Sequence, residues 1–235
     1  MGAWEITMLI IAEVLITLAA FSAIIALIVF SIRNPIRKHK PIDMLIFDKI
    51  KPGVNAINNK IMLFITFLGK HQFLIPANLF LISYFLLVKK QNWFSIRVIT
   101  IAISSLVLML LLKQLFQRKR PLSPLLKAAK GLSFPSGHAM GSIVIYGMLT
   151  YLLILSFKQQ ISKFIVTTMV VFILLIGFSR LYLGAHYFSD VMAGYVAGLG
   201  WLGIVISGTE IARRHKRGRS SSETLLEAES EVIPT

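Results

Sequence analysis

The sequence has no cysteine and few acidic residues: its 235 residues include 10 Asp and Glu against 25 Lys and Arg. The lack of cysteine excludes disulfides, thiolate nucleophiles and Cys-ligated metals, so any covalent chemistry must use His, Ser, Asp or Lys. The deficit of acids leaves a formal charge of +15, which is typical of nucleic-acid binders. Here, however, 56% of the residues are hydrophobic. This share argues against binding to nucleic acid and indicates an integral membrane protein.

Six apolar stretches approach the length of a transmembrane helix, about 20 residues. We therefore predict an all-α polytopic membrane protein in which residues 1–212 form a bundle of six transmembrane helices. The first stretch contains one charge, Glu13, and is too long for a cleaved signal peptide. The predicted spans are Ile6–Ile32, Gln72–Val88, Phe94–Leu112, Ala139–Phe157, Phe164–Leu183 and His186–Ser207.

Two segments lie outside this pattern. Residues 33–71 form an interfacial loop that opens with a basic cluster, and apolar residues recur within it every three or four positions. That spacing predicts an amphipathic helix lying in the membrane interface. Residues 213–235 are first basic and then acidic and Ser-rich, which predicts a disordered tail. The periodic apolar residues of the loop are Ile46, Ile50, Val54, Ile57 and Ile61.

An even number of spans places both termini on one side of the bilayer. The loops after spans one, three and five then lie on the other side. The short basic clusters 89–97 and 213–219 favour cytoplasmic termini. We expect a multi-pass protein of the cell membrane, in bacteria the inner membrane, with its odd loops on the periplasmic or outer face.

Three polar clusters interrupt the apolar pattern, and all three fall at the ends of spans that border the odd loops. The topology therefore places them at one membrane face, where they can form a single site. Ionisable groups at a membrane boundary are costly to desolvate and normally have a partner. The clusters contain Lys113 and Arg120-Pro121; Pro135, Ser136, Gly137 and His138; and Ser179-Arg180, His186 and Asp190.

The residue types in these clusters suit phosphate chemistry. Lys113, Arg120 and Arg180 are three cations, and guanidinium groups match phosphate oxygens with two hydrogen bonds. Ser136 and Gly137 precede an apolar helix, so Ser136 is a candidate N-cap and the free N–H groups beside Gly137 can bind an anion.

The remaining groups suit nucleophilic catalysis. His186 and Asp190 are four residues apart, so on a helix they would share a face and touch. A carboxylate on one imidazole nitrogen makes the other a better nucleophile. His138 is then available as the general acid for the leaving oxygen.

Each cluster also has a simpler interpretation. A single intramembrane His is more often a packing residue, and the basic residues near position 120 alone would be an ordinary positively charged helix end. We interpret Arg118, Lys119, Lys127 and Lys130 as loop charges. A metal site built from His138, His186 and Asp190 is the competing interpretation, but three neighbouring cations would repel a divalent ion. In the last span, Gly194 and Gly198 predict close helix packing.

The chain contains K-x6-R-P, P-S-G-H and S-R-x5-H-x3-D in that order. This order resembles the three-part signature of the type 2 phosphatidic acid phosphatase superfamily, and the chain matches every position of that signature. The resemblance implies a phosphatase that needs no metal or other cofactor. By that family's chemistry, His186 would form a phosphohistidine, Asp190 would orient it and His138 would protonate the leaving group. Phosphate oxygens would be bound by Lys113, Arg120, Ser136, Gly137 and Arg180.

The leading hypothesis is a lipid phosphate phosphatase that works among membrane lipids; protein partners stay undefined. Candidate substrates are undecaprenyl diphosphate, phosphatidic acid, phosphatidylglycerophosphate and a lipid A phosphate. A soluble-substrate phosphatase or haloperoxidase is disfavoured by the six spans. The hypothesis from another class is an anion transporter or channel that uses the same cationic cluster. Against it, the charges gather at one face instead of along a path.

Overall fold

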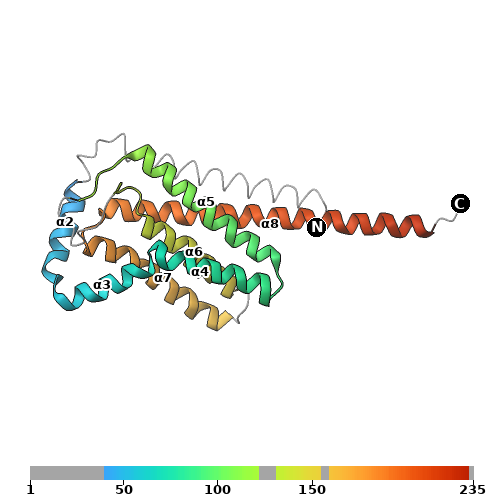
Figure 1. Cartoon of the computed structure of the whole chain (residues 1–235), viewed down its shortest axis with the longest axis horizontal. Coiled ribbons are helices and arrows are strands. Elements are labelled where there is room, and N and C mark those ends of the chain that lie inside the picture. Colours follow the sequence, from blue (N-terminus) through green and yellow to red (C-terminus); the bar gives the residue numbers. More distant parts are fainter. Residues whose placement is uncertain (1–39, 122–130, 155–158, 233–235) are drawn as a thin grey trace.

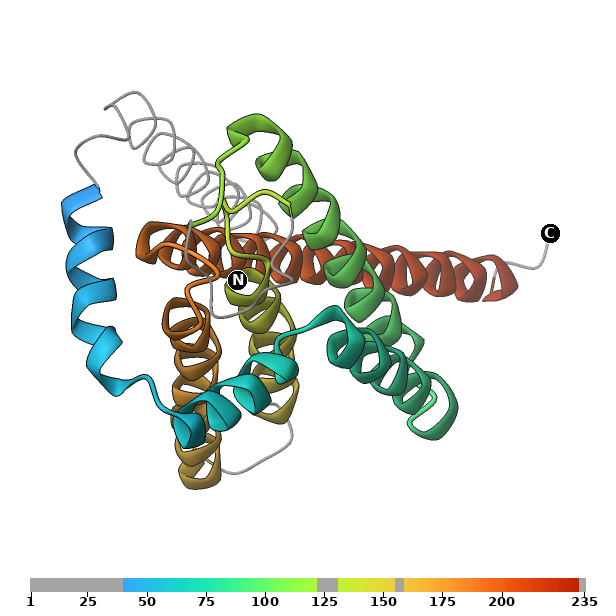
Figure 2. The same cartoon turned by 60° about the vertical axis from the view of Figure 1, so that its left-hand side comes forward.

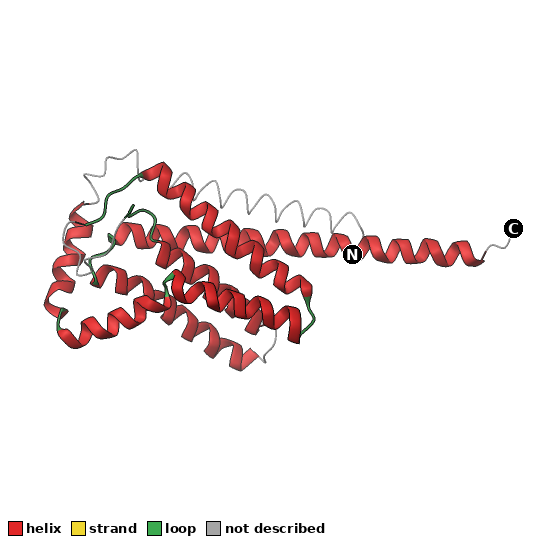
Figure 3. Cartoon of the chain, viewed as in Figure 1, coloured by secondary structure: helices red, strands yellow, loops and turns green. Residues whose placement is uncertain are grey.

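A computed structural model describes residues 40–121, 131–154 and 159–232, and every regular element in these ranges is helical (Figure 3). The all-α prediction is confirmed. A 3₁₀ turn at Lys51–Gly53 and a π-helical turn at Tyr84–Val88 accompany the α-helices. The α-helices are α2 (Lys40–Ile50), α3 (Ala56–Leu68), α4 (His71–Ser83), α5 (Asn92–Phe116), α6 (Gly137–Ile154), α7 (Gln159–Tyr182) and α8 (Phe188–Val232).

Five segments of the described chain are long and apolar enough to cross a membrane. They match the second to sixth predicted spans; the predicted first span, Ile6–Ile32, lies outside the described residues. Large apolar side chains on these helices face outward, as a lipid environment requires: Phe80 is 73% exposed and Leu199 is 64% exposed. These features indicate a multi-pass membrane protein. The segments are His71–Val88, Asn92–Phe116, Gly137–Ile154, Lys163–Tyr182 and Phe188–Ile211.

Helix α6 lies at the centre of the bundle and packs closely against α8 (Figure 1). Two glycines of α8 permit this approach. A Cβ on Gly194 would lie 2.7 Å from the carbonyl oxygen of Ser136, and one on Gly198 would lie 3.0 Å from the carbonyl oxygen of Met140. The predicted packing role of Gly194 and Gly198 is therefore confirmed. On the other side, α7 packs against α6 and carries Ile176 into a fully buried position.

The loop before the second span contains two helices, α2 and α3, where the sequence predicted an amphipathic helix. The backbone turns at Pro52 and Gly53, because proline cannot continue the α-helical hydrogen bonding, and α3 restarts at the N-cap Asn55. Helix α2 crosses one end of the bundle and α3 packs on α7 (Figure 2). Ile46 and Ile50 pack into the bundle. The segment thus contributes to the fold as well as to the interface.

The chain after residue 212 also differs from the predicted disordered tail. Helix α8 continues unbroken to Val232 and extends far beyond the other helices (Figure 1). A physical reason is local: the segment from Glu223 to Glu229 consists mainly of Glu, Leu and Ala, which are strong helix formers. The charge pattern alone, basic and then acidic, does not reveal this preference.

Candidate active site

The three polar clusters of the sequence meet at one end of the helix bundle. Lys113 lies in the last turn of α5, the Pro-Ser-Gly-His segment opens α6, and Arg180 lies in the last turn of α7. His186 and Asp190 flank the start of α8. The structure therefore brings together at one site the residues that the topology predicted to share a face.

A tight turn at the end of α7 positions His186. Gly184 has the left-handed φ of 62°, its N–H donates to the carbonyl of Leu181, and the N–H of Ala185 donates to the carbonyl of Arg180. These two bonds define a Schellman turn, in which glycine avoids the strain that a Cβ would cause. The N–H of His186 also points to the Arg180 carbonyl, at 3.4 Å. The turn thus connects an active-site cation directly to the predicted nucleophile.

The His186 ring is buried between a cation and a carboxylate. Nη1 of Arg120 lies 3.1 Å from Nε2 of His186, and Nδ1 lies 3.7 Å from Oδ2 of Asp190. If the ring proton of His186 is assigned to Nδ1, that nitrogen faces the carboxylate of Asp190, and Nε2 can accept a hydrogen bond from the guanidinium of Arg120. Burial is the main cause that lowers the pKa of His186 to about 4; Arg120 and Arg180 contribute to the shift, whereas Asp190 opposes it. The imidazole is therefore uncharged at neutral pH, as a nucleophile must be.

The expected geometry of His186 and Asp190 needs one correction. Helix α8 begins at Phe188, so His186 precedes the helix and does not share a helical face with Asp190. The two side chains approach across the helix start instead. Ser133 lies between them: its hydroxyl donates to Oδ2 of Asp190 and lies 3.4 Å from Nδ1 of His186. Ser133, which sequence reasoning missed, therefore bridges imidazole and carboxylate.

Asp190 is fully buried, and its charge is compensated by donors from several elements. The N–H of Tyr187 donates to Oδ2 at 2.9 Å, which is a capping interaction at the first turn of α8. Nη1 of Arg118 donates to Oδ1 at 2.6 Å. The backbone carbonyl of Asp190 accepts the N–H of Ser136. These contacts fix the carboxylate relative to both the predicted nucleophile and the start of α6.

Arg118 is not a loop charge, as the sequence interpretation had it. Besides Asp190, its guanidinium pairs with Asp43 of α2 at 3.0 Å and donates to Ser189 at 2.7 Å. It also lies over the Tyr187 ring, 4.2 Å from the ring centre. No motif spacing marks Arg118, because its main partners are 72 and 75 residues away in sequence.

The Pro-Ser-Gly-His segment has the local structure predicted for it. The hydroxyl of Ser136 accepts the N–H of Ala139 at 3.5 Å, so Ser136 is an N-cap of α6. A Cβ on Gly137 would lie 2.7 Å from the sulfur of Met109. Lys113 donates to the carbonyl of Pro135 at 3.1 Å and to that of Leu132 at 2.9 Å, which fastens this segment to α5. An ammonium group has three donors, so one remains for a ligand.

Two site nitrogens are buried without a hydrogen-bond partner among the described residues: Nε2 of His138 and Nε of Arg180. Buried polar groups are normally paired, so an unpaired one needs an explanation, and a ligand is one such explanation. Nη1 of Arg180 is fixed by the hydroxyl of Thr66 in α3, at 2.6 Å. By contrast, Ser179 of the third motif donates to the carbonyl of Ile176 within its own helix.

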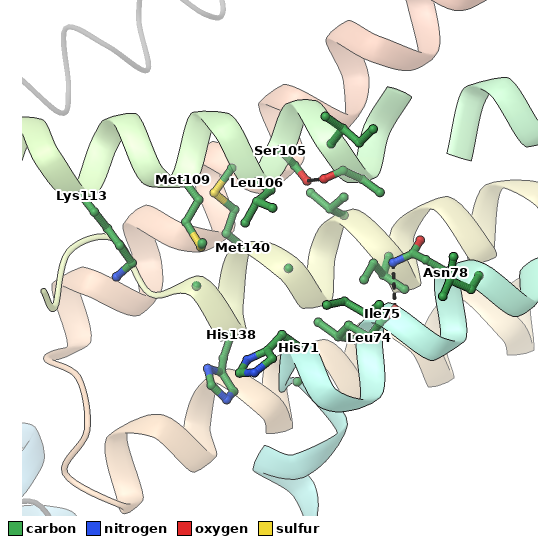
Figure 4. Close-up of a pocket in the computed structure, with 18 of the residues that line it drawn as sticks. His71, Leu74, Ile75, Asn78, Ser105, Leu106, Met109, Lys113, His138 and Met140 are labelled. Carbon is green, nitrogen blue, oxygen red and sulfur yellow. Dashed lines mark hydrogen bonds between the residues drawn. The ribbon is translucent and has the colours of Figure 1, made fainter. Parts of the chain in front are cut away.

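A cavity of about 660 Å³ leads away from these groups between α4, α5 and α6 (Figure 4). Lys113, Arg120, Gly137, His138 and His186 line its polar end. Arg180, Ser136 and Asp190 are buried around that end but do not line the cavity. The remainder of the wall is mostly apolar and includes Leu74, Leu79, Ile82, Ile103, Leu106 and Val144. The cavity thus combines a cationic end with an apolar channel.

Comparison with known proteins gives a family and a curated relative. A model of the PAP2 superfamily matches residues 94–214, a range that includes all three polar clusters. Phosphatidylglycerophosphatase B of Bacillus subtilis (strain 168) is 32% identical over 143 residues, which are 60% of this chain and 70% of that protein.

Two solved structures have a similar fold. A transmembrane PAP2 type phosphatidylglycerolphosphate phosphatase from Bacillus subtilis superposes with a TM-score of 0.68 at 26% identity, covering 86% of this chain and 96% of the other. LpxE of Aquifex aeolicus superposes with a TM-score of 0.52 at 22% identity, covering 69% of this chain and 93% of the other. The second likeness concerns the fold alone.

Proposed function

The chain belongs to the PAP2 superfamily, and from that premise we propose that it removes a phosphate group from a membrane lipid through a phosphohistidine at His186. The observation that carries the proposal is the cavity, whose cationic end continues into an apolar channel between transmembrane helices. A phosphate group suits the first part and an acyl or prenyl chain suits the second. A hydrated anion in transit, as a transporter or channel requires, would gain nothing from the apolar wall.

The first chemical step follows from the site. Nε2 of His186 attacks phosphorus, the P–O bond to the leaving group breaks, and His138 gives its proton to the leaving oxygen. Because Nη1 of Arg120 lies 3.1 Å from Nε2, its guanidinium can bind an oxygen of the phosphoryl group under attack. Lys113 and Arg180 supply further positive charge, which is most valuable where negative charge develops.

The second step restores the enzyme. A water attacks the phosphohistidine, His138 takes the proton of that water, and phosphate leaves with the P–N bond broken. We propose that Ser136 and Gly137 support this chemistry through the backbone that opens α6. Asp190 keeps the attacking nitrogen unprotonated, because the proton of the neutral ring stays on Nδ1, which faces the carboxylate.

The names of the similar proteins and the cations of the site support further proposals about the substrate and the metal requirement. The names of the B. subtilis relatives indicate phosphatidylglycerophosphate as the substrate of those proteins. We propose a substrate of this class, with undecaprenyl diphosphate, phosphatidic acid and a lipid A phosphate as alternatives. We also propose that the reaction needs no metal, since the cations do the electrostatic work, and that the site faces the periplasm or the outside.

The test is phosphate release by the full-length protein in detergent, with phosphatidylglycerophosphate, phosphatidic acid and undecaprenyl diphosphate, in the presence of a chelator. We expect turnover in chelator and a loss of roughly 10³-fold or more in His186→Ala. A quenched reaction should contain a phosphoryl–protein adduct that is stable to alkali and labile to acid, as a P–N bond is.

Three results would contradict parts of the proposal. Loss of turnover in chelator would remove the metal-free mechanism, and an active His186→Ala protein would remove the nucleophile. Equal turnover of short-chain soluble esters and long-chain lipids would remove the lipid substrate. A thermal unfolding measurement on His186→Ala separates loss of chemistry from loss of fold.

A further inference from the structure

Two basic residues outside the three motifs lie beside the site, at the start of α4. Lys70 is the residue before the helix and His71 is its first residue. His71 lines the same cavity as His138, and Figure 4 shows both imidazoles at the same end of that cavity. Gly69 connects this segment to the site, because a Cβ there would lie 3.1 Å from Cδ2 of His138. The absence of a side chain thus allows the α3–α4 connection to approach the proposed general acid.

The basic charge of this segment has no counter-ion in the described chain, where neither Lys70 nor His71 forms an ion pair with a carboxylate. Lys70 is near enough to His138 for its charge to act on that imidazole. The two residues also stand at the positive end of the α4 dipole. Together with the unpaired, buried Nε2 of His138, the ammonium of Lys70 and the imidazole of His71 place one cation and two hydrogen-bonding rings beside the phosphate site.

The orientation of the substrate in the site determines which part of it lies next to Lys70 and His71. In the proposed reaction, the phosphoryl group under attack would lie between His186 and the three motif cations, and His138 would face the leaving oxygen. The lipid chain of the leaving group must then enter the apolar channel, whose wall on α4 begins at Leu74 and Ile75. His71 lines the cavity one turn before these residues. The part of the leaving group nearest its oxygen therefore passes the start of α4.

We propose that Lys70 and His71 form a leaving-group subsite that binds a second phosphate of the substrate. The inference rests on the proposed function and narrows it to lipids whose leaving group is itself a phosphate ester. Two such leaving groups have the required chemistry: the phosphodiester of phosphatidylglycerophosphate and the second phosphate of a prenyl diphosphate. Phosphatidic acid has no second phosphate and gains nothing from the subsite.

The experiment compares substrates in variants of the full-length protein. In Lys70→Ala, His71→Ala and the double variant, we expect kcat/KM for lipids with two phosphates to fall roughly five- to tenfold per substitution. For phosphatidic acid it should stay within twofold. Gln72→Ala is the matched control, because Gln72 is exposed in the same turn and carries neither a charge nor an imidazole. Separate assays with phosphatidylglycerophosphate and undecaprenyl diphosphate distinguish the two sources of the second phosphate.

A binding measurement keeps this inference separate from the proposed chemistry. In a His186→Ala background, the Kd for phosphatidylglycerophosphate should rise with Lys70→Ala and His71→Ala, while the Kd for phosphatidic acid should not. If the wild-type protein turned over no lipid but this difference in binding remained, the catalytic proposal would fail and the subsite would stand. Equal loss with all lipids, or no loss with either lipid that has two phosphates, would overturn the subsite.

Discussion

A single guanidinium group, that of Arg118, joins two buried carboxylates from opposite ends of the sequence. Its Nη1 donates to Asp190, and its Nη2 pairs with Asp43 of α2. Both acids are at most 3% exposed. Removing one partner from a buried ion pair leaves an uncompensated charge, at a cost of about 3–5 kcal/mol. We therefore expect Arg118 to be a positioning residue, which acts on the chemistry through Asp190 and does not line the cavity.

We expect Arg118→Ala to lower kcat for lipid phosphate hydrolysis at least roughly tenfold, because Asp190 then loses a charged donor at 2.6 Å. Arg118→Lys should restore part of the rate, since an ammonium keeps the charge but not the two-pronged geometry. KM should change little in either variant. Phosphate release under saturating and limiting substrate measures both constants.

Lys119→Ala is the matched control for Arg118, because it removes an exposed cation from the adjacent position. A kcat in Arg118→Ala equal to that of this control would show that the carboxylate is held without Arg118.

At the same scale, the sequence could predict which residues gather at the candidate site but not how they are held. Residue type and order were enough to group His138, His186 and the cations. Ser133 and Arg118 were missed, because each matters through contacts between residues far apart in sequence. Hydrophobic periodicity contains no information about such pairs. The start of α8 was misplaced for a related reason: the turn at Gly184 separates His186 from the helix.

At the scale of elements, the packing of α8 on α6 joins two parts of the site. Gly194 of α8 lies against the carbonyl of Ser136, and a Cβ on this glycine would also lie 3.2 Å from the backbone nitrogen of Met140. These neighbours are backbone atoms at the start of α6, which can move only with the whole segment. Helix contact in this bundle therefore also sets the position of the Pro-Ser-Gly-His turn.

We predict that Gly194→Ala lowers the unfolding temperature by roughly 5 °C and reduces turnover, because the added Cβ would lie 2.7 Å from the carbonyl oxygen of Ser136. Gly203→Ala is the control, since a Cβ there meets nothing within 4 Å. Alanine is the better helix former, so the control should be neutral or slightly stabilising. Thermal unfolding in detergent compares the two; equal melting temperatures would contradict the packing argument.

The buried Arg97 shows that counting basic residues is a limited guide to the orientation of helices in the membrane. It was counted among the basic residues that favour a cytoplasmic side, yet it is fully buried and pairs with Glu210 at 2.9 Å. Its guanidinium also donates to Thr209 and to Tyr151, and so joins α5, α6 and α8 at the end opposite the site. Arg97 thus connects three helices inside the bundle.

At the scale of the whole molecule, the orientation in the membrane stays a prediction. With Arg97 set aside, Lys89, Lys90 and the basic start of the α8 extension still favour cytoplasmic termini. We therefore predict that a reporter fused after Thr235 behaves as cytoplasmic, and that one inserted after Lys119 behaves as external. Alkaline phosphatase and fluorescent-protein fusions give opposite signals on the two sides. The reverse pattern would place the site on the cytoplasmic face and contradict the expected location.

Helix α8 connects the candidate site to the segment that protrudes from the bundle. Asp190 in its first turn and Val232 at its last residue belong to one unbroken helix, and the rise from the first to the second is about 63 Å. The carboxylate that we expect to orient His186 and the protruding end of α8 are therefore parts of one continuous helix. Between these two points, the backbone of α6 lies against the helix at Gly194 and Gly198, and Arg97 of α5 binds it at Thr209 and Glu210.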